Sequence, residues 1–486
     1  MRCRAAARHP SSTGDAFTMT QFDHSTFISP FTWRYGSREM RSVFSEEHKR
    51  LLLRRIWIAL AKAEAKAGLV SDEQVAELEA HGKDIDIERA SLIEAEIHHD
   101  LMAEIRTYAE QCPKAGSIIH LGATSMDILD NMDAIRLKEA LGIIIDRTRD
   151  LLSAFLEKME AYADVPCMAF THLQPAEITT VGYRFSQSAQ DLLEDMEELE
   201  RTLSSIRGKG MKGAVGTGAS YAELVRGRGM SAMDLEKEVM DELGLECFDA
   251  ATQIYTRKQD LRVIQALSGL CCTMYRFAAD FRILMSPPIG EWSEPFGSRQ
   301  VGSSAMPFKR NPINCEKVDS LTRYVSSLYM TAWQNGATTF LERTLDDSAN
   351  RRLMLPQAFL ATEEALVTLT KVVKGMTIHE GAVGRMMSSY GMFSATERLL
   401  MELGRRGADR QEMHEVIRQA SLKAWAQVQE GGENDLDRTL MADKRILEYI
   451  TPDEIASLLD ADSYVGDAPR RTRIVAERIR RTLDRP

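Results

Sequence analysis

The feature that most constrains the fold is the spacing of apolar residues over long stretches of the chain. Between Phe185 and Ile206 these residues recur at alternating intervals of three and four: Ala189, Leu192, Met196, Leu199, Leu203 and Ile206. Such spacing places them on one face of an α-helix, as in helical bundles. At ~1.5 Å per residue the helix would be about 33 Å long, which predicts an elongated bundle.

Other segments extend this prediction. A second apolar seam comprises Leu267, Cys271, Met274, Ala278 and Phe281. Further long helical tracts are expected between Asp133 and Ala163 and after Pro312, while segments with the period of two that is typical of strands are nearly absent. We therefore expect an all-α protein built around a central bundle of long helices, which are joined by loops that contain glycine or proline.

The chain is long enough for several domains. We expect a disordered N-terminal tail (1–30), an N-terminal helical domain (31–124), a central long-helix bundle that carries the signature loops (125–378) and a C-terminal helical domain (379–486). Beyond about residue 378 the helices become shorter and more charged, which favours a separate C-terminal domain. The first residues are basic and loosely resemble a transit peptide, but we favour a disordered tail or translation that begins at Met19.

Composition excludes several classes of protein. The formal net charge of −11 argues against a general binder of nucleic acid or of anionic membranes. No apolar run approaches the ~18 residues that a membrane span needs. The seven cysteines form neither CxxC pairs nor zinc-finger spacing, which predicts reduced thiols in a cytoplasmic protein.

Two motifs have alternative interpretations. Gly208, Gly210 and Gly213 match the dinucleotide-binding fingerprint, but a helix is expected before them where that fingerprint needs a strand. We interpret these glycines as a helix end, and we expect no cofactor. The histidines His98, His99, His120 and His172 match no metal-ligand spacing, so we expect no metal and favour acid–base use of one or two of them.

Four polar segments lack the periodicity of a helix that faces a core: Leu121–Ser125, Thr171–Ala176, Gly302–Pro312 and Glu342–Arg352. The segment Gly302–Pro312 combines two serines, a lysine and two prolines, a mixture suited to binding an anion. The segment Leu121–Ser125 has two interpretations: it binds a carboxylate, or Thr124 or Ser125 simply caps a helix. The fourth holds three arginines and is either a phosphate clamp or a solvated surface with salt bridges.

The order of the first three segments resembles the three signature regions of the fumarase/aspartase superfamily, whose members release fumarate by β-elimination. Within it, four stretches are similar to the adenylosuccinate lyase family, and to its animal-like branch in particular: Arg34–Tyr35, Ser117–Ser125, Gln253–Lys258 and Glu342–Arg352. The resemblance implies a homotetramer that shares the bundle and the active sites between subunits.

The resemblance also implies the reaction. Members of the family cleave adenylosuccinate to AMP and fumarate, and they release fumarate from succinylated aminoimidazole carboxamide ribotide. The runner-up is another fumarate-releasing lyase, such as argininosuccinate lyase, which would share the Ser303 loop but has no need of a phosphate clamp. A non-catalytic helical scaffold is a further alternative, which the joint presence of Ser303, His172, Glu316 and Lys309 disfavours.

Roles for individual residues follow from the resemblance alone. Ser303 is the expected general base, His172 the general acid and Glu316 its carboxylate partner, while His99 assists and Lys309 stabilises negative charge. The expected substrate-binding residues are Arg34, Tyr35, His98, Asp100, Thr124, Ser125, Thr171, Gln253, Asn311, Lys317, Arg343, Ser348 and Arg352. His98 stands where close relatives usually have arginine, and Lys317 stands where they often have it, which leaves the preference between the two substrates open.

Overall fold

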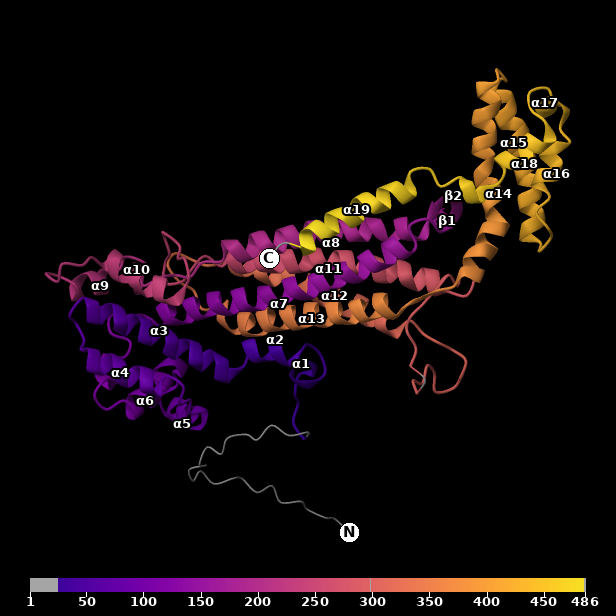
Figure 1. The fold of residues 1–486 in the computed structure, drawn as a ribbon. Coiled ribbons are helices and arrows are strands. Elements are labelled where there is room, and N and C mark those ends of the chain that lie inside the picture. Colours follow the sequence, from indigo (N-terminus) through magenta and orange to yellow (C-terminus); the bar gives the residue numbers. More distant parts are fainter. Residues whose placement is uncertain (1–24, 298, 485–486) are drawn as a thin grey trace, which may run out of the picture. The chain divides into compact units, whose positions relative to one another are not determined.

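The computed structural model describes residues 25–297 and 299–484 (Figure 1). The predicted N-terminal tail lies outside the described residues, apart from residues 25–30. The chain forms two compact units. The first comprises the described residues up to Glu139 together with Ile206–Gln259 and Gly336–Asp347, and the second comprises Ala140–Ser205, Asp260–Asn335 and the described residues from Ser348 onward.

The first unit is built from short helices, the long helix α3 and the first part of α7. Its elements are α1 (Pro30–Trp33), α2 (Arg38–Val43), α3 (Glu46–Lys66), α4 (Asp72–His81), α5 (Ile87–Ile97), α6 (Asp100–Gln111), the 3-10 turn η1 (Gly116–Ile118), α7 (Ser125–Ala161), α9 (Ala219–Leu224) and α10 (Ala232–Leu243). The Ser45 side chain caps α3, and Gly68 follows its last turn with a φ of +66°, as expected for a helix that ends at glycine.

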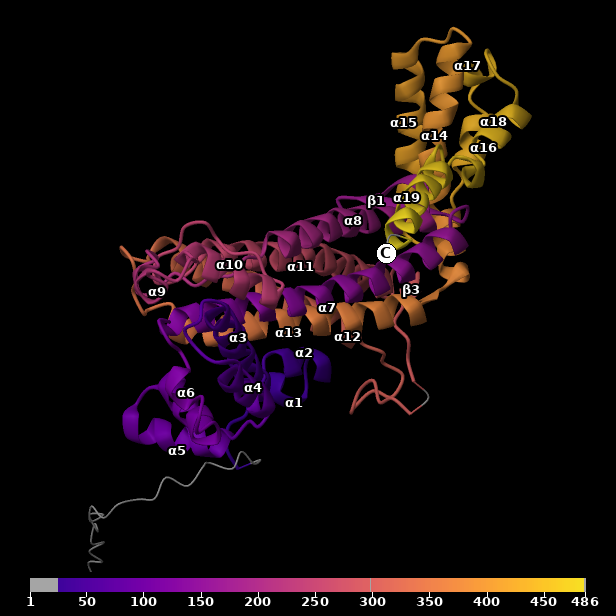
Figure 2. The ribbon, with the colours of Figure 1, turned by 60° about the vertical axis from the view of Figure 1, so that its left-hand side comes forward.

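The second unit contains the long-helix bundle. Its helices are the remainder of α7, α8 (Val181–Ser205), α11 (Lys258–Met285), α12 (Ile313–Ala337) and α13 (Ser348–Gly375). They run side by side in Figures 1 and 2. The second predicted seam is fully buried: Leu267, Cys271, Met274, Ala278 and Phe281. The first is buried at Ala189, Leu192, Met196, Leu199 and Ile206, whereas Leu203 is half-buried. The all-α prediction is confirmed.

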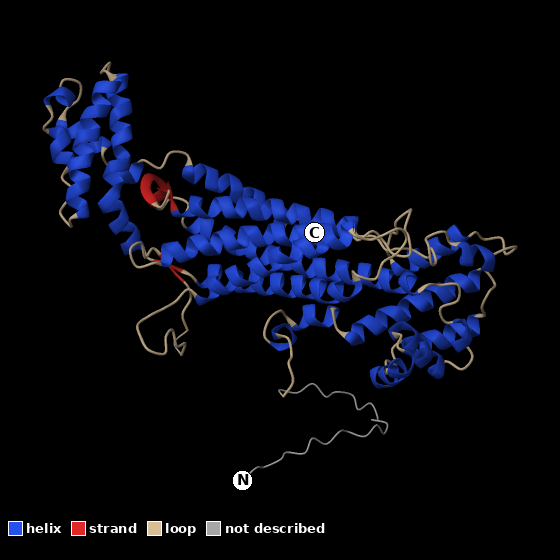
Figure 3. Ribbon diagram, turned by 180° about the vertical axis from the view of Figure 1, so that it is seen from behind, coloured by secondary structure: helices blue, strands red, loops and turns tan. Residues whose placement is uncertain are grey.

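Strands are few in the described part of the chain (Figure 3). β1 (Pro166–Thr171) and β2 (Gln174–Thr180) form an antiparallel hairpin, and β3 (Trp292–Ser293) pairs with β4 (Thr377–Ile378). The sequence analysis did not predict the hairpin, which contains the segment Thr171–Ala176. A register shift between Met168 and Phe170 interrupts its ladder, which is one reason why no regular alternation appears in the sequence.

The C-terminal helices form a group with a core of its own. It comprises α14 (Glu380–Arg405), α15 (Arg410–Gln429), α16 (Leu436–Met441), α17 (Lys444–Leu447) and α18 (Pro452–Leu458). Leu399, Leu403 and Leu436 are buried at its centre. After the turn η2 (Ala461–Ser463), the last helix α19 (Ala468–Leu483) leaves this group and packs along α8 (Figure 1). Within the described residues, no helix has the length and apolar character that crossing a membrane requires.

Candidate active site

Ser303 lies in a polar turn that distinguishes it from its neighbour Ser304. Its hydroxyl oxygen accepts hydrogen bonds from the backbone N–H groups of Ala305 (3.3 Å) and Met306 (3.0 Å). The Ser304 hydroxyl forms no hydrogen bond with the described residues. Donors that point at an oxygen favour its ionised form, so this arrangement favours deprotonation of Ser303 over that of Ser304.

The loop that contains Ser303 also carries two further candidate residues, Lys309 and Asn311. The Lys309 ammonium group is exposed and forms no ion pair with the described residues. The Asn311 amide donates to the backbone carbonyl of Gly302 at 3.4 Å. Lys309 therefore supplies a cation within the loop that also carries the candidate base.

Glu316 and Lys317, in the first turns of α12, both have partners within the second unit. The Glu316 carboxylate lies 3.7 Å from the guanidinium group of Arg282, and the Lys317 ammonium group lies 2.7 Å from the carboxylate of Glu364. The Glu316 carboxylate thus partly neutralises the charge of Arg282, and the Glu364 carboxylate that of Lys317. The expected pairing of Glu316 with a histidine stays a prediction.

His172 occupies the tip of the hairpin. Thr171 and Gln174 form its last pair, so that His172 and Leu173 make a two-residue turn. Both have positive φ values, +55° and +59°, as a type I′ turn requires. The imidazole is exposed and has no hydrogen bond among the described residues. The turn thus holds the candidate acid outward, where it is free to meet a substrate.

A cavity of about 1000 Å³ lies beside this hairpin within the second unit. The hairpin residues Leu173 and Gln174 line it, together with side chains from α8, α11, α14, α15 and α19. Arg276 and Arg471 contribute positive charge. No candidate residue predicted from the sequence lines this cavity, so its position alone does not define the catalytic centre.

In the first unit, His98, His99 and Asp100 form the junction between α5 and α6. His98 ends α5 with a φ of +54°, and the Nδ1 atom of His99 accepts a hydrogen bond from the backbone N–H of Met102 at 3.2 Å. The Asp100 carboxylate lies 3.9 Å from the same Nδ1 atom. The His99 side chain is 47% exposed, and its Nε2 atom remains available.

His120 lies near His99 and differs from it in environment. The indole N–H of Trp57 donates to the Nδ1 atom of His120 at 3.2 Å, which leaves the proton on Nε2 in the neutral ring. Burial lowers the pKa of His120 to about 4; the charge of Asp127 opposes this shift, and His99 contributes to it. His120 is therefore a neutral imidazole at physiological pH, and it presents an N–H donor.

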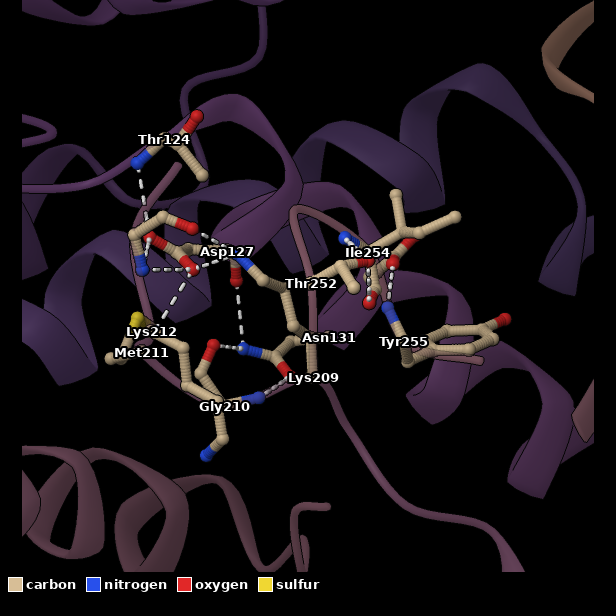
Figure 4. A network of polar contacts seen from close by, with 12 residues as sticks. Thr124, Asp127, Asn131, Lys209, Gly210, Met211, Lys212, Thr252, Ile254 and Tyr255 are labelled. Carbon is tan, nitrogen blue, oxygen red and sulfur yellow. Dashed lines mark hydrogen bonds and ion pairs between the residues drawn. The ribbon is translucent and has the colours of Figure 1, made fainter. Parts of the chain in front are cut away.

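Thr124 and Ser125 lie at the start of α7, next to the buried carboxylate of Asp127. The backbone N–H of Thr124 donates to Asp127 at 3.0 Å (Figure 4). Asp127 also accepts from the backbone N–H groups of Lys212 and Gly213, each at 3.1 Å, and from the ammonium group of Lys209. One carboxylate thus ties the predicted Thr-Ser loop to the glycine loop that follows α8.

One turn further along α7, Asp130 organises the segment that contains Gln253. It accepts from the backbone N–H of Tyr255 at 2.7 Å and from the guanidinium group of Arg257 at 3.0 Å. The backbone N–H of Gln253 donates to the carbonyl of Glu342 at 3.2 Å. This contact brings together two segments that the sequence analysis singled out separately.

In the arginine segment Glu342–Arg352, Arg343 and Arg351 form ion pairs with carboxylates. Arg343 donates to Asp347 at 2.9 Å, and Asp347 also binds the buried Arg257 at 2.6 Å. Burial lowers the pKa of Arg343. Arg351 pairs with Asp260 at 2.7 Å inside the second unit. Two of the three arginines in this segment therefore form structural ion pairs, and Arg352 is exposed.

The remaining candidates fall into the two units as follows. In the first unit, Arg34 ends α1 with its guanidinium group 5.9 Å from the centre of the Tyr35 ring. In the second unit, Ser348 and Arg352 lie in the first turns of α13, and Thr171 precedes His172 in the hairpin. No group of three or more His, Cys, Asp or Glu side chains in the described residues is arranged to hold a metal ion.

Comparison with known proteins adds to this geometry. A family model described as "Lyase" matches residues 35–326, and one described as "Adenylosuccinate lyase C-terminus" matches residues 393–475. The chain is 39% identical to the adenylosuccinate lyase of Saccharomyces cerevisiae, with 92% of this chain and 93% of that protein aligned. It is 36% identical to that of Pyrococcus abyssi, over 91% and 95% of the two chains.

The chain belongs to the adenylosuccinate lyase family.

Solved structures support the family fold. A fumarate lyase from Mesorhizobium sp. BNC1 aligns with a TM-score of 0.80 at 20% identity, covering 91% of this chain and 98% of that one. The 3-carboxy-cis,cis-muconate lactonizing enzyme from Pseudomonas putida aligns with a TM-score of 0.81 at 22% identity, covering 93% and 99%. The fumarase/aspartase-like helical fold is therefore confirmed.

For this member of the family, sequence reasoning missed the buried residues that fix the candidate loops: Asp127, Asp130, Asn131, Lys209, Lys212, Arg257 and Asp347. Asp127, Asp130 and Asn131 are buried polar residues at spacings of three and four on α7. That spacing places the three polar side chains on one face of α7, and this polar face could have been recognised from the sequence. Their partners are distant in sequence, which left no local sign that this polar face is buried.

Proposed function

We propose that this chain cleaves adenylosuccinate to AMP and fumarate, and succinylated aminoimidazole carboxamide ribotide to fumarate and the free carboxamide ribotide. The observation that carries the proposal is the similarity to adenylosuccinate lyases over more than nine tenths of both chains, at identities up to 39% among the relatives compared. The match of residues 393–475 to the C-terminal model of that family favours it over an argininosuccinate lyase.

Ser303 removes the proton next to a substrate carboxylate in the proposed mechanism. A serine hydroxyl is a weak base until its oxyanion is stabilised. The two backbone N–H donors from Ala305 and Met306 support this role, because they strengthen as negative charge develops on the hydroxyl oxygen. Lys309, in the same loop, supplies a positive charge for the carboxylate that accumulates negative charge during elimination.

His172 protonates the departing nitrogen. Imidazole titrates near neutral pH, so it donates a proton to the leaving group and regains one afterwards. Its outward position at the hairpin tip supports this role, and Glu316 acts as its carboxylate partner in the assembled site. His99 assists from the junction of α5 and α6, where its Nδ1 atom is already engaged by a backbone N–H.

The remaining candidates bind substrate in this proposal. The succinyl portion is bound by Thr124, Ser125, Thr171, Gln253, Lys309 and Asn311, and the nucleotide by Arg34, Tyr35, Arg343, Ser348 and Arg352. His98, Asp100 and Lys317 complete the pocket. Several cations are needed because each substrate carries a phosphate and two carboxylates.

The active enzyme is a homotetramer in the cytoplasm, with each site shared between subunits. Apolar side chains that remain exposed along α12 and α13 support the assembly, since such surfaces favour burial against another chain. They are Ile313, Tyr324, Met330, Trp333, Leu353 and Val367. Sedimentation that shows a stable, fully active monomer would contradict this part of the proposal.

One assay tests the reaction. Purified protein is incubated separately with adenylosuccinate, with succinylated aminoimidazole carboxamide ribotide and with argininosuccinate, and fumarate release is followed. We expect release from both succinyl nucleotides and none from argininosuccinate. Release from argininosuccinate alone would reject the proposed function in favour of the alternative lyase.

A further inference from the structure

The loop that carries Ser303 is closed at its base by a buried carboxylate. Glu294, at the start of the loop, accepts hydrogen bonds from the backbone N–H groups of Asn314 (3.1 Å) and Cys315 (2.7 Å) and from the Asn314 side chain (2.7 Å). These groups form the first turn of α12, where a negative charge is favoured. The two ends of the loop are therefore fastened to each other.

A second contact crosses the loop above this base. The guanidinium group of Arg310 lies 4.8 Å from the centre of the Phe296 ring. This is the geometry of a cation–π interaction. Phe296 is half-buried, whereas Arg310 is exposed, so the contact joins a half-buried residue on one side of the loop to an exposed residue on the other.

A third contact lies next to Ser303. A Cβ atom at Gly302 would approach the carbonyl oxygen of Lys309 to 2.3 Å and the Phe296 ring to 3.2 Å. The chain therefore passes so close to itself at Gly302 that a side chain has no room there. The Asn311 amide also donates to the Gly302 carbonyl. This approach directly precedes the turn that places two N–H donors on Ser303.

We propose that Phe296 and Arg310 are positioning residues for Ser303. Their cation–π contact, here called the clasp, holds the two sides of the loop together at Gly302 and so maintains the turn in which Ser303 accepts from Ala305 and Met306. Neither residue touches the reacting atoms in this proposal. The inference rests on the proposed function for its kinetic readout and extends it by assigning two residues to the geometry of the base.

The kinetic test replaces each partner by an apolar residue of similar length. Phe296→Leu and Arg310→Met should each lower kcat for adenylosuccinate about two- to fivefold, with KM changed less than about twofold. The double variant should have about the same kcat as the slower single variant, because all three variants lose the same contact. Phe296→Tyr retains a ring face and should retain activity.

Arg299→Met is the matched control. Arg299 is another exposed arginine of the loop, and it has no ion pair with the described residues. It should leave kcat and KM unchanged. If Arg299→Met lowers kcat as much as Arg310→Met, or if Arg310→Met raises KM while Phe296→Leu has no effect, Arg310 acts on the substrate by charge and the clasp is rejected.

Limited trypsin digestion tests the clasp independently of catalysis. Phe296→Leu leaves the cleavage sites at Lys309 and Arg310 intact, so only the freedom of the loop changes. We expect faster cleavage there than in the wild-type protein and an unchanged rate in Phe296→Tyr. Equal rates in wild type and Phe296→Leu would overturn the inference. Failure of the wild-type protein to release fumarate would instead reject the proposed function, and the digestion would still judge the clasp.

Discussion

The carboxylate of Asp127 and the ammonium group of Lys209 lie 2.5 Å apart, and both side chains are fully buried. Burial lowers the pKa of Lys209, while the neighbouring charge of Asp127 opposes that effect. The same carboxylate accepts from three backbone N–H groups of two loops. A charge paired in this way is tolerated in the interior, but either partner alone is not.

Removing one member of this pair should therefore destabilise the protein strongly. Lys209→Met keeps the length of the side chain but leaves Asp127 charged and unpaired, and we expect a loss of about 3–5 kcal/mol in the free energy of unfolding. Urea denaturation measures the change. As a control, Lys66→Met removes an exposed ion pair with Glu238 and should cost less than about 1 kcal/mol. Similar effects of the two substitutions would contradict this account of the network.

The two neighbouring serines should differ sharply in their effect on catalysis. Ser303→Ala should lower kcat at least about a thousandfold, because it removes the proposed base, whereas Ser304→Ala should retain activity within about fivefold. Circular dichroism and thermal unfolding should match the wild-type protein for both variants. Equal losses, or a Ser303→Ala variant that retains most of its activity, would remove Ser303 from the proposed role.

The sequence predicted the long helices because their pattern is local. Each apolar seam depends on residues three or four apart, and the burial of Met196 and Met274 follows from that spacing alone. The hairpin was not predictable in the same way, since Pro175 lies within β2 and the pairing shifts register near Phe170. A proline within a run disfavours a central strand, and an irregular ladder removes the alternation.

The candidate site shows the same limit. The loop containing Ser303 was recognisable from its residue types, but the preference for Ser303 over Ser304 rested on resemblance. The distinguishing feature is the pair of N–H donors from Ala305 and Met306, which depends on backbone geometry. In the same way, Asp127 and Lys209 are charged residues separated by many positions, and a sequence does not reveal that both are buried and paired.

Glu64 should make stability depend on pH. Burial raises the pKa of its carboxyl group to about 8 from the ordinary value of 4.5, and neither carboxyl oxygen has a hydrogen-bond partner among the described residues. Between these two values the unfolded chain releases the proton while the folded chain keeps it. The free energy of unfolding therefore falls as pH rises from about 4.5 to 8 through this group.

Glu64→Gln should remove this contribution. At pH 5 the variant and the wild-type protein should be similar in stability, while near pH 8 the variant should be more stable by several kcal/mol, at ~1.4 kcal/mol per pKa unit. Urea denaturation at both pH values measures the difference. Glu433→Gln, at an exposed glutamate, should shift stability equally at both pH values. A gap between wild type and Glu64→Gln that does not widen with pH would refute the assignment.

The hairpin tip should prefer glycine to alanine at residue 173. Leu173 is 66% exposed and has a φ of +59°, a conformation that costs residues with a Cβ atom about 1–2 kcal/mol. Leu173→Gly and Leu173→Ala both remove the exposed side chain, but only glycine relieves this strain. Part of that gain is offset because glycine is more flexible in the unfolded chain.

We expect Leu173→Gly to be more stable than Leu173→Ala by about 1 kcal/mol in urea denaturation, the reverse of the order within regular strands. Equal stability of the two variants, or greater stability of Leu173→Ala, would show that the turn does not hold His172 and Leu173 in the left-handed conformation in solution.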